Sequence, residues 1–191
     1  STLMEGRDKK NILIDGKPLL LLVTELITSL FEEVLIVTNS SINIHYEIFR
    51  NVILVNDIFP RRGPLGGLHS GLVYSSFDTV FCVGCDMPAL SKEMIEKQIE
   101  YSKEAKDQSW DAIVPRLDAL VEPLHGLYKK SIENRLRLML SEERNNSIQG
   151  LLRRVKTEYY PLENTEKNRS CFRNINTPKE YNEYLKKRKE F

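Results

Sequence analysis

Val80–Leu90 of the 191-residue chain reads VFCVGCDMPAL, and this stretch decides how the rest of the sequence is interpreted. Val80 to Asp86 is apolar, β-branched and aromatic with a turn after it, which predicts a buried strand that ends at an acid. Cys82 and Cys85 have the C-x-x-C spacing of a redox dithiol or of half a zinc site. Because side chains alternate faces along a strand, residues three apart point to opposite faces. We therefore interpret the two cysteines as packing residues and Asp86 as the functional residue.

Composition and charge indicate an ordinary globular protein with one domain. Hydrophobic residues make up 41% and charged residues 29%, and the formal net charge is +1. Such a balance gives no overall attraction to nucleic acid or to a membrane surface. The longest apolar run, Leu19 to Val23, is far shorter than a membrane span. Three cysteines do not form a disulfide framework, and with no secretory signal they predict a reducing cytoplasm.

Strand-like runs alternate with helical runs along the chain. The predicted strands are 34–38, 52–55, 80–83, 111–115 and 124–128. The predicted helices are 18–30, 66–74, 91–103, 131–140 and 147–155, and a last helix begins at the capping box Thr177–Glu180. Strands without polar alternation, separated by helices, predict an α/β fold: a single Rossmann-like three-layer domain with a mostly parallel sheet.

Ligands of such folds bind at the carboxyl ends of the strands. Asn39, Asp57 and Asp86 follow the first three predicted strands there, and a strand-end acid is a common ligand of Mg²⁺, which needs few protein carboxylates. The glycine-rich segment 61–67 allows backbone amides to approach a planar ligand or a phosphate. Residues 174–178 precede a helix N-terminus, where anions are favoured. The chain contains no G-x-G-x-x-G, Walker, G-x-S-x-G or H-E-x-x-H motif.

Several segments, in this order, resemble the molybdenum cofactor guanylyltransferase family. At the start, Met4, Gly6, Asp8, Lys9 and Gly16–Leu19 follow the family's opening pattern. The later segments are Gly63–Gly67, Cys85–Pro88, Val114–Arg116, Glu122–Tyr128 and Asn174–Pro178, which resemble its guanine-side loop and its C-D-M-P, V-P-R, P-L-H-A-L-Y and N-I-N-T-P motifs. The similarity spans nearly the whole chain. D-K and G-P-L are shared by many nucleotidyltransferases, whereas E-P-L-H together with N-I-N-T-P is more specific.

The resemblance implies a fold of the nucleotide-diphospho-sugar transferase type and an Mg²⁺-dependent transfer of GMP from GTP to molybdopterin, with release of pyrophosphate. It implies that Lys9 and Asp86 are catalytic, with Lys9 on the GTP phosphates and Asp86 on Mg²⁺. It places the nucleotide near Asn39, Asp57, Gly63, Pro64 and Leu65. It lines the molybdopterin side with Glu122, Pro123, Leu124, His125, Asn174, Asn176 and Thr177. Other molybdenum cofactor biosynthesis proteins are candidate partners.

The front of the chain departs from the family pattern. The family begins with a central strand and the glycines L-A-G-G, whereas this chain starts after them and has Leu3 where the motif has arginine. A sheet that lacks a central strand would expose backbone groups and apolar faces, so we expect further residues upstream of Ser1. Two other hypotheses remain: a small nucleotidyltransferase that uses CTP, and a non-catalytic GTP-binding protein of the same fold.

Overall fold

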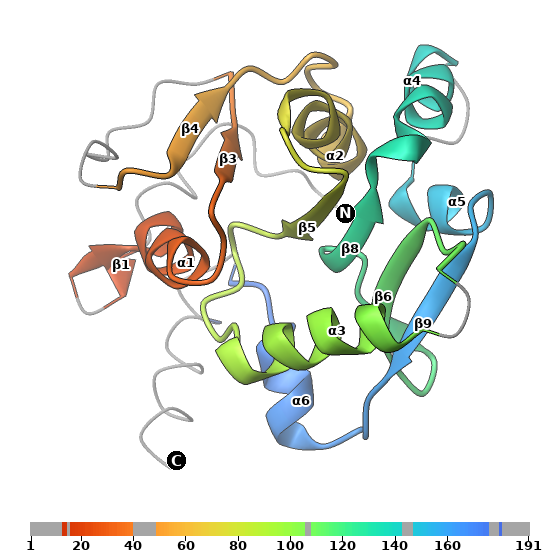
Figure 1. Ribbon diagram of the computed structural model, residues 1–191. Helices are drawn as coiled ribbons and strands as arrows, with labels where there is room; N and C mark the ends of the chain where they lie inside the picture. Colours follow the sequence, from red (N-terminus) through yellow and green to blue (C-terminus); the bar gives the residue numbers. More distant parts are fainter. Residues whose placement is uncertain are drawn as a thin grey trace.

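The computed structural model describes residues 13, 14, 16–39, 49–105, 108–142, 147–175 and 180, and Figure 1 shows how their elements are arranged. The strands are β1 Leu13–Ile14, β2 Lys17–Pro18, β3 Val34–Val37, β4 Val52–Val55, β5 Thr79–Val83, β6 Ala112–Leu117, β7 Leu120–Val121, β8 His125–Lys129 and β9 Thr157–Pro161. The helices are α1 Leu19–Thr28, α2 Gly63–Tyr74, α3 Lys92–Glu104, α4 Glu133–Ser141, α5 Ile148–Leu152 and α6 Glu166–Cys171, with the 3-10 helix η3 at Lys130–Ile132.

The largest sheet is mixed, with strand order β5-β8-β6-β7 and with β9 beside β6. Strand β8 is antiparallel to both of its neighbours, β9 is parallel to β6, and β3 and β4 form a separate parallel pair. The mostly parallel sheet is therefore not confirmed, since four ladders among the described residues are antiparallel and two are parallel. Only residues 118–124 separate β6 from β8. A parallel crossover needs about a dozen residues or more, so β8 has to return antiparallel.

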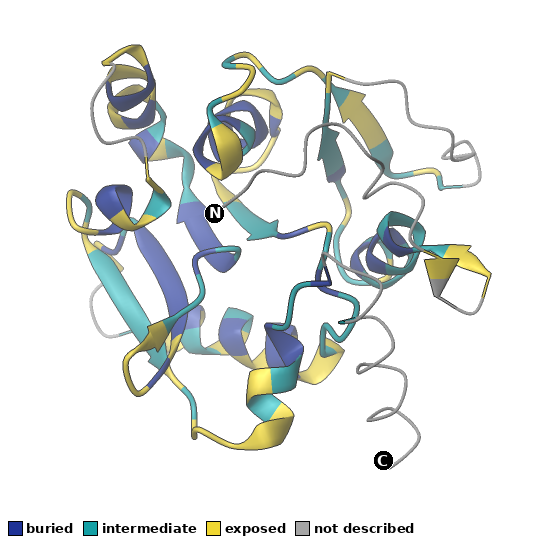
Figure 2. Ribbon diagram, turned by 180° about the vertical axis from the view of Figure 1, so that it is seen from behind, coloured by how far each residue is buried: buried dark blue, intermediate teal, exposed yellow. Residues whose placement is uncertain are grey.

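Helices cover both faces of the sheet, and the side chains of β5 show which helix covers which face. Val80 and Cys82 pack into the cluster formed with α2, α4 and α5. Phe81 and Val83 pack on the other side, against α1 and α3. This alternation is the ordinary consequence of strand geometry. The three-layer arrangement is confirmed for the described residues, and Figure 2 shows β6 and β8 buried between the layers.

Short polar caps explain where several helices begin. Ser91 Oγ accepts a hydrogen bond from the Met94 amide at 3.2 Å, as the sequence predicts for the start of α3. Ser147 and Thr165 cap α5 and α6 in the same way. Each cap satisfies one of the backbone amides that a helix N-terminus leaves without a partner.

Some elements differ from the sequence prediction. Strand β5 ends at Val83, so Asp86 lies in the turn after it. Cys82 is half-buried but Cys85 is exposed, and the interpretation of both as packing residues is therefore wrong for Cys85. The β1-β2 hairpin and the elements β7, β9 and α6 were not predicted. Of the helix expected after Thr177, the described residues include only Glu180, which is helical. No helix within the described ranges is long and apolar enough to cross a bilayer.

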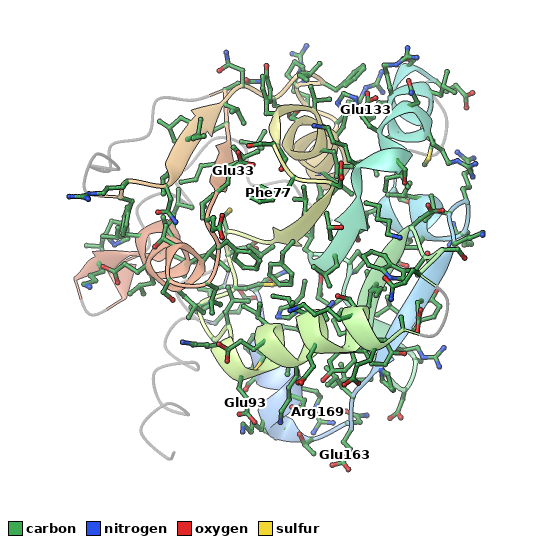
Figure 3. The ribbon with its side chains drawn as sticks, in the orientation of Figure 1. Glu33, Phe77, Glu93, Glu133, Glu163 and Arg169 are labelled. Carbon is green, nitrogen blue, oxygen red and sulfur yellow. The ribbon has the colours of Figure 1, made fainter. Side chains whose placement is uncertain are left out.

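Strands β3 and β5 begin at the same edge of the molecule. Glu33, directly before β3, accepts hydrogen bonds from the Ser75 hydroxyl at 2.9 Å and from the Ser76 amide at 3.0 Å (Figure 3). These two serines lie shortly before β5 begins at Thr79. Because β4 runs parallel to β3, the carboxyl ends of β3, β4 and β5 lie at the opposite edge.

Candidate nucleotidyltransferase site

Two residues predicted on the nucleotide side are joined across the ends of β3 and β4. Asn39 Nδ2 donates to the Asp57 carbonyl oxygen at 3.1 Å, and the Asp57 amide donates to Asn39 Oδ1 at 2.8 Å. The side-chain amide of Asn39 has one donor group and one acceptor group, so it pairs with a backbone as a neighbouring strand would. It thereby extends the parallel ladder beyond its last pair, Val37 and Val55.

The Asp57 carboxylate is held by α2 and by the segment before this helix. Its Oδ1 accepts from the Phe59 amide at 3.0 Å and from the Ser70 hydroxyl at 3.2 Å. A Cβ atom at Gly66 would lie 2.8 Å from the Phe59 carbonyl oxygen and 3.1 Å from Asp57 Oδ1. Only glycine permits this approach, so the glycine-rich segment sets the position of Asp57.

The segment predicted to contact guanine starts α2 three residues earlier than expected. Arg61 and Gly63 have φ angles of 65° and 60°, a left-handed conformation that favours glycine. Gly63 and Pro64 are exposed. Leu65 is 1% exposed and packs in the core with residues of α4, so neither its side chain nor its backbone is accessible to a surface ligand.

A second group of contacts gathers around Asp86, at the end of β5. The Gly84 amide donates to the Leu124 carbonyl oxygen at 3.1 Å, and the Ile175 amide donates to the Asp86 carbonyl oxygen at 2.9 Å. The Leu124 amide donates to Glu122 Oε1 at 3.0 Å. The structure thus brings the C-D-M-P and E-P-L-H segments together with Ile175. No hydrogen bond between described residues joins this group to the Asn39–Asp57 pair.

Asp86 and Glu122 place two carboxylates in one electrostatic environment. Burial raises the pKa of Glu122, the hydrogen bond from Leu124 lowers it, and the negative charge of Asp86 raises it again. A Cβ atom at Gly84 would lie 3.0 Å from Asp86 Oδ1, so glycine leaves room for the carboxylate there. Carboxylate oxygens are the ligands that Mg²⁺ prefers, and the residues present fit this ion. Groups of three or more metal-binding side chains are absent from the described part of the chain.

His125 belongs to the core behind the E-P-L-H segment. It is 0% exposed, and its Nδ1 lies 2.9 Å from Gln98 Oε1. The rings of Phe81 and Phe172 meet it edge to face at 5.0 and 5.1 Å. Burial lowers the pKa of His125 to about 4, so the imidazole is neutral at physiological pH. Its buried position gives it no direct access to a surface ligand.

The remaining predicted residues have different positions. Pro123 is buried, and its carbonyl oxygen accepts from the Tyr128 hydroxyl at 2.8 Å. Asn174 Oδ1 is buried without a hydrogen-bond partner among the described residues. Lys9, Asn176 and Thr177 lie outside the described residues.

Comparison with known proteins now assigns the family. A family model described as a MobA-like NTP transferase domain matches residues 1–158. The chain belongs to this family. The molybdenum cofactor guanylyltransferase of Vibrio atlanticus (strain LGP32) is 32% identical over 183 residues, which make up 95% of this chain and 88% of that relative. The chain therefore contains a nucleotidyltransferase domain.

Two solved structures support the mixed α/β nucleotidyltransferase fold. Molybdopterin-guanine dinucleotide biosynthesis protein A from Archaeoglobus fulgidus has a TM-score of 0.77 and 25% identity, over 97% of this chain and 93% of that one. The 4-diphosphocytidyl-2C-methyl-D-erythritol synthase of Anaerococcus prevotii DSM 20548 has a TM-score of 0.64 and 15% identity, over 93% of each chain. The second likeness concerns the fold alone.

In this MobA-like domain the environment of Cys82 does not favour a reactive thiol. None of the three cysteines, all of which lie in the described part of the chain, forms a disulfide bond. Burial, with a smaller contribution from the charge of Glu122, raises the pKa of the Cys82 thiol to about 12. A thiol of this kind carries almost no thiolate at neutral pH, and the thiolate is the reactive form.

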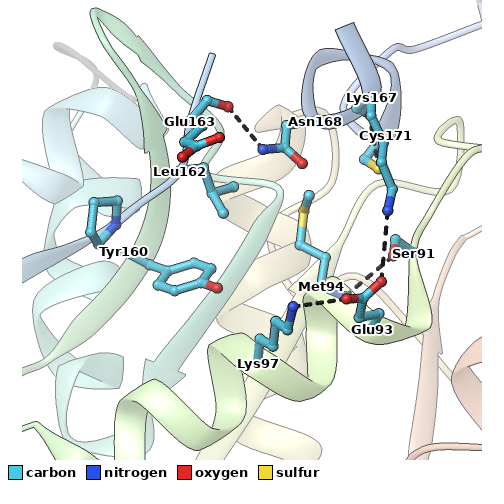
Figure 4. Close-up of a pocket in the computed structure, with 11 residues that line it drawn as sticks. Ser91, Glu93, Met94, Lys97, Tyr160, Leu162, Glu163, Lys167, Asn168 and Cys171 are labelled. Atoms are coloured by element: carbon cyan, nitrogen blue, oxygen red, sulfur yellow. Dashed lines mark hydrogen bonds and ion pairs between the residues drawn. The ribbon is translucent and has the colours of Figure 1, made fainter. Parts of the chain in front are cut away.

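A pocket of about 290 Å³ that sequence reasoning missed lies between α3, α6 and the end of β9 (Figure 4). Glu93 lines it and faces the ammonium groups of Lys97 at 2.7 Å and Lys167 at 3.8 Å. Both ammonium groups are thus paired with the same carboxylate, and Glu163 adds a second acid to the lining of the pocket. Gln98 was missed as well, and the available signal was a polar side chain on the apolar face of α3, which carries Met94 and Ile95.

Proposed function

We propose that this protein transfers GMP from GTP to molybdopterin and so forms the molybdopterin guanine dinucleotide and pyrophosphate. The observation that carries the proposal is the meeting of Asp86 with the segments 122–124 and 174–175 at the end of β5, in a chain of the MobA-like family. The names of the relatives from Vibrio atlanticus and Archaeoglobus fulgidus support the choice of substrates.

The proposed chemistry needs positioning and charge balance more than proton transfer. An oxygen of the terminal phosphate of molybdopterin forms a bond to the α-phosphorus of GTP. The bond between the α-phosphorus and the oxygen that links it to the β-phosphorus breaks, and pyrophosphate leaves with that oxygen. A phosphate is already an anionic nucleophile, so no general base is required. The protein's contribution is to hold both substrates in line and to offset their negative charge.

We assign roles to the residues that meet at the strand ends. Asp86 would hold Mg²⁺, with Glu122 as the neighbouring acid, and the Ile175 amide fixes the backbone of Asp86. When bound, Mg²⁺ would supply charge neutralisation and alignment of the phosphates. The joined pair Asn39 and Asp57 would hold the nucleoside side.

The remaining assignments concern the phosphates, the guanine and the acceptor substrate. Lys9 would contact the GTP phosphates, and the exposed backbone at Gly63 and Pro64 would approach the guanine. The segments around Glu122 and Asn174 would bind molybdopterin, for which the buried unpaired Oδ1 of Asn174 is a candidate acceptor.

Reconstitution with GTP, molybdopterin and Mg²⁺ tests this proposal, with the dinucleotide separated by chromatography and pyrophosphate measured in parallel. We expect Asp86→Ala to abolish product. Asp78→Ala is the matched control, because Asp78 is an exposed acid just before the other end of β5, and it should retain wild-type turnover. Full activity of Asp86→Ala would contradict the metal role.

The same assay separates the alternatives. A clear preference for CTP over GTP would favour a cytidylyltransferase. Calorimetric binding of GTP without any turnover in the presence of molybdopterin would favour a non-catalytic nucleotide-binding protein.

A further inference from the structure

A fully buried glutamine on α3 makes three hydrogen bonds behind the E-P-L-H segment. Gln98 is 0% exposed. Its Nε2 donates to the Ile113 carbonyl oxygen on β6 at 3.0 Å and to the His125 carbonyl oxygen on β8 at 3.2 Å. Its Oε1 lies 2.9 Å from His125 Nδ1. Both amide protons and one acceptor position of the side chain are therefore used.

Gln98 acts where β6 and β8 stop pairing. The ladder between these strands contains only Ala112 with Tyr128 and Ile113 with Leu127. Beyond it, β6 pairs with β7, while β8 continues beside β5 as far as His125. Buried carbonyl groups at such a divergence need other partners, and Gln98 supplies two of them. It therefore helps to set the place at which β8 begins, directly after the turn 122–124.

The same hydrogen bonds determine which nitrogen of His125 carries the proton. Because Gln98 Nε2 donates to two carbonyl groups, its Oε1 has to accept, and the proton lies on His125 Nδ1. Burial keeps the ring neutral, and Nε2 has no hydrogen-bond partner within the described residues. The ring edge contacts with Phe81 and Phe172 then fix its plane. Phe172 opens the segment 172–175, whose last amide donates to Asp86.

We propose that Gln98 is a positioning residue for the second substrate, acting through the start of β8 on the turn 122–124 and through His125 and Phe172 on the segment 172–175. The inference rests on the proposed function, which assigns these two segments to molybdopterin. Gln98 does not touch substrate, because it is fully buried. The nucleoside side depends on the separate hydrogen bonds of Asn39 and Asp57, so GTP binding should respond to Gln98 less than molybdopterin binding, and only through Asp86.

Three variants test the proposal. Gln98→Met keeps the length of the side chain and removes the amide. Gln98→Glu keeps the oxygen that accepts from His125 and, when protonated in this buried site, one donor. Ile95→Val is the control, since Ile95 is 0% exposed on the same face of α3 but packs against Val23 and Val34 instead.

Steady-state kinetics, normalised to folded protein by circular dichroism, give the first readout. Gln98→Met should raise KM for molybdopterin by about tenfold. The scale follows from catalysis in general, where a misplacement of the reacting groups by about 1 Å can lower the rate by about 100-fold. KM for GTP should change much less than KM for molybdopterin. Gln98→Glu should be intermediate, and Ile95→Val should leave both constants unchanged. Equal changes for both substrates, or the same change in Ile95→Val, would overturn the proposal.

Nuclear magnetic resonance gives a second readout that does not depend on turnover. The ring nitrogens of wild-type His125 should show a proton on Nδ1. The amide signals of Leu124 and Ile175 should move in Gln98→Met but not in Ile95→Val, and Gln98→Glu replaces Gln98→Met if the latter does not fold. If the wild-type protein makes no dinucleotide, the proposed function fails and these signals decide alone: shifted amides support the positioning role, and unchanged amides overturn it.

Discussion

Acidification should destabilise the folded protein through His125. This side chain is 0% exposed, and burial lowers its pKa from the ordinary value of 6.5 to about 4. Between these two pH values the unfolded chain binds a proton that the folded protein excludes, so the free energy of unfolding falls as the pH falls. At about 1.4 kcal/mol for each pH unit, His125 should lower it by roughly 2.5 kcal/mol between pH 7.5 and pH 4.5.

His125→Asn isolates this contribution. The amide of asparagine can stand where Nδ1 stands and donate to Gln98 Oε1, and it does not titrate. The variant should be less stable than wild type at pH 7.5, because it loses the ring contacts with Phe81 and Phe172. The free energy of unfolding of the variant should nevertheless fall less on acidification. Over the same pH interval its decrease should be roughly 2.5 kcal/mol smaller than that of wild type.

Urea unfolding at four pH values between 7.5 and 4.5 measures both curves. The single tryptophan, Trp110, is 6% exposed and reports unfolding by fluorescence, with circular dichroism as the second probe. Carboxylates that titrate in this range are present in both proteins and cancel in the comparison. Parallel curves for wild type and His125→Asn would refute the conclusion that the folded protein keeps this ring neutral.

Three further predictions concern close backbone approaches and a helix cap. Gly84→Ala brings a Cβ atom within 3.0 Å of Asp86 Oδ1, so turnover should drop by about tenfold with little change in Tm; wild-type turnover would contradict this. Gly126→Ala places a Cβ atom 2.8 Å from Val114 Cγ1. Calorimetry should show that the free energy of unfolding falls by about 1–3 kcal/mol, and the second substitution Val114→Ala should restore part of this loss. Ser91→Ala should lower the free energy of unfolding, measured with urea, by about 1 kcal/mol, and Ser91→Thr should lower it by less. Equal losses in the two variants would argue against the cap.

Local signals predicted most of the elements that surround the site. The strand at 52–55 has the predicted bounds, and α3 begins after Ser91 as predicted. Both signals act over a few residues. A short apolar run forms an extended strand, and a hydroxyl accepts a hydrogen bond from the backbone amide three positions later. The polar residues after β3, β4 and β5 were found in the same way, because each lies within three residues of the end of a recognisable strand.

Strand direction and the late elements were predicted less well. The alternation of helices and strands predicts a mostly parallel sheet, whereas the connection 118–124 is too short for a parallel crossover and β8 returns antiparallel. Strand β9 was missed because 157–161 is polar in part and ends in proline. It pairs with β6, far away in sequence, and this contact stabilises it as a strand.

Motif residues that look equivalent in the sequence have different environments in the fold. Leu65 and His125 lie within segments expected to face ligands, yet both are buried. Cys85 was expected inside and is exposed. Gln98, which belongs to no motif, makes three buried hydrogen bonds. A motif records which residues occur in order, whereas burial depends on the layers packed above each one.

The sequence by itself determined the order of strands and helices and the presence of Asn39, Asp57 and Asp86 at strand ends, because these features depend on neighbours in the chain. Only the tertiary structure decided that β8 runs against β5 and β6 and that Ile175 holds the backbone of Asp86. Such contacts join segments that are distant in sequence. Their geometry follows from how the sheet and helices pack together, which no local pattern specifies.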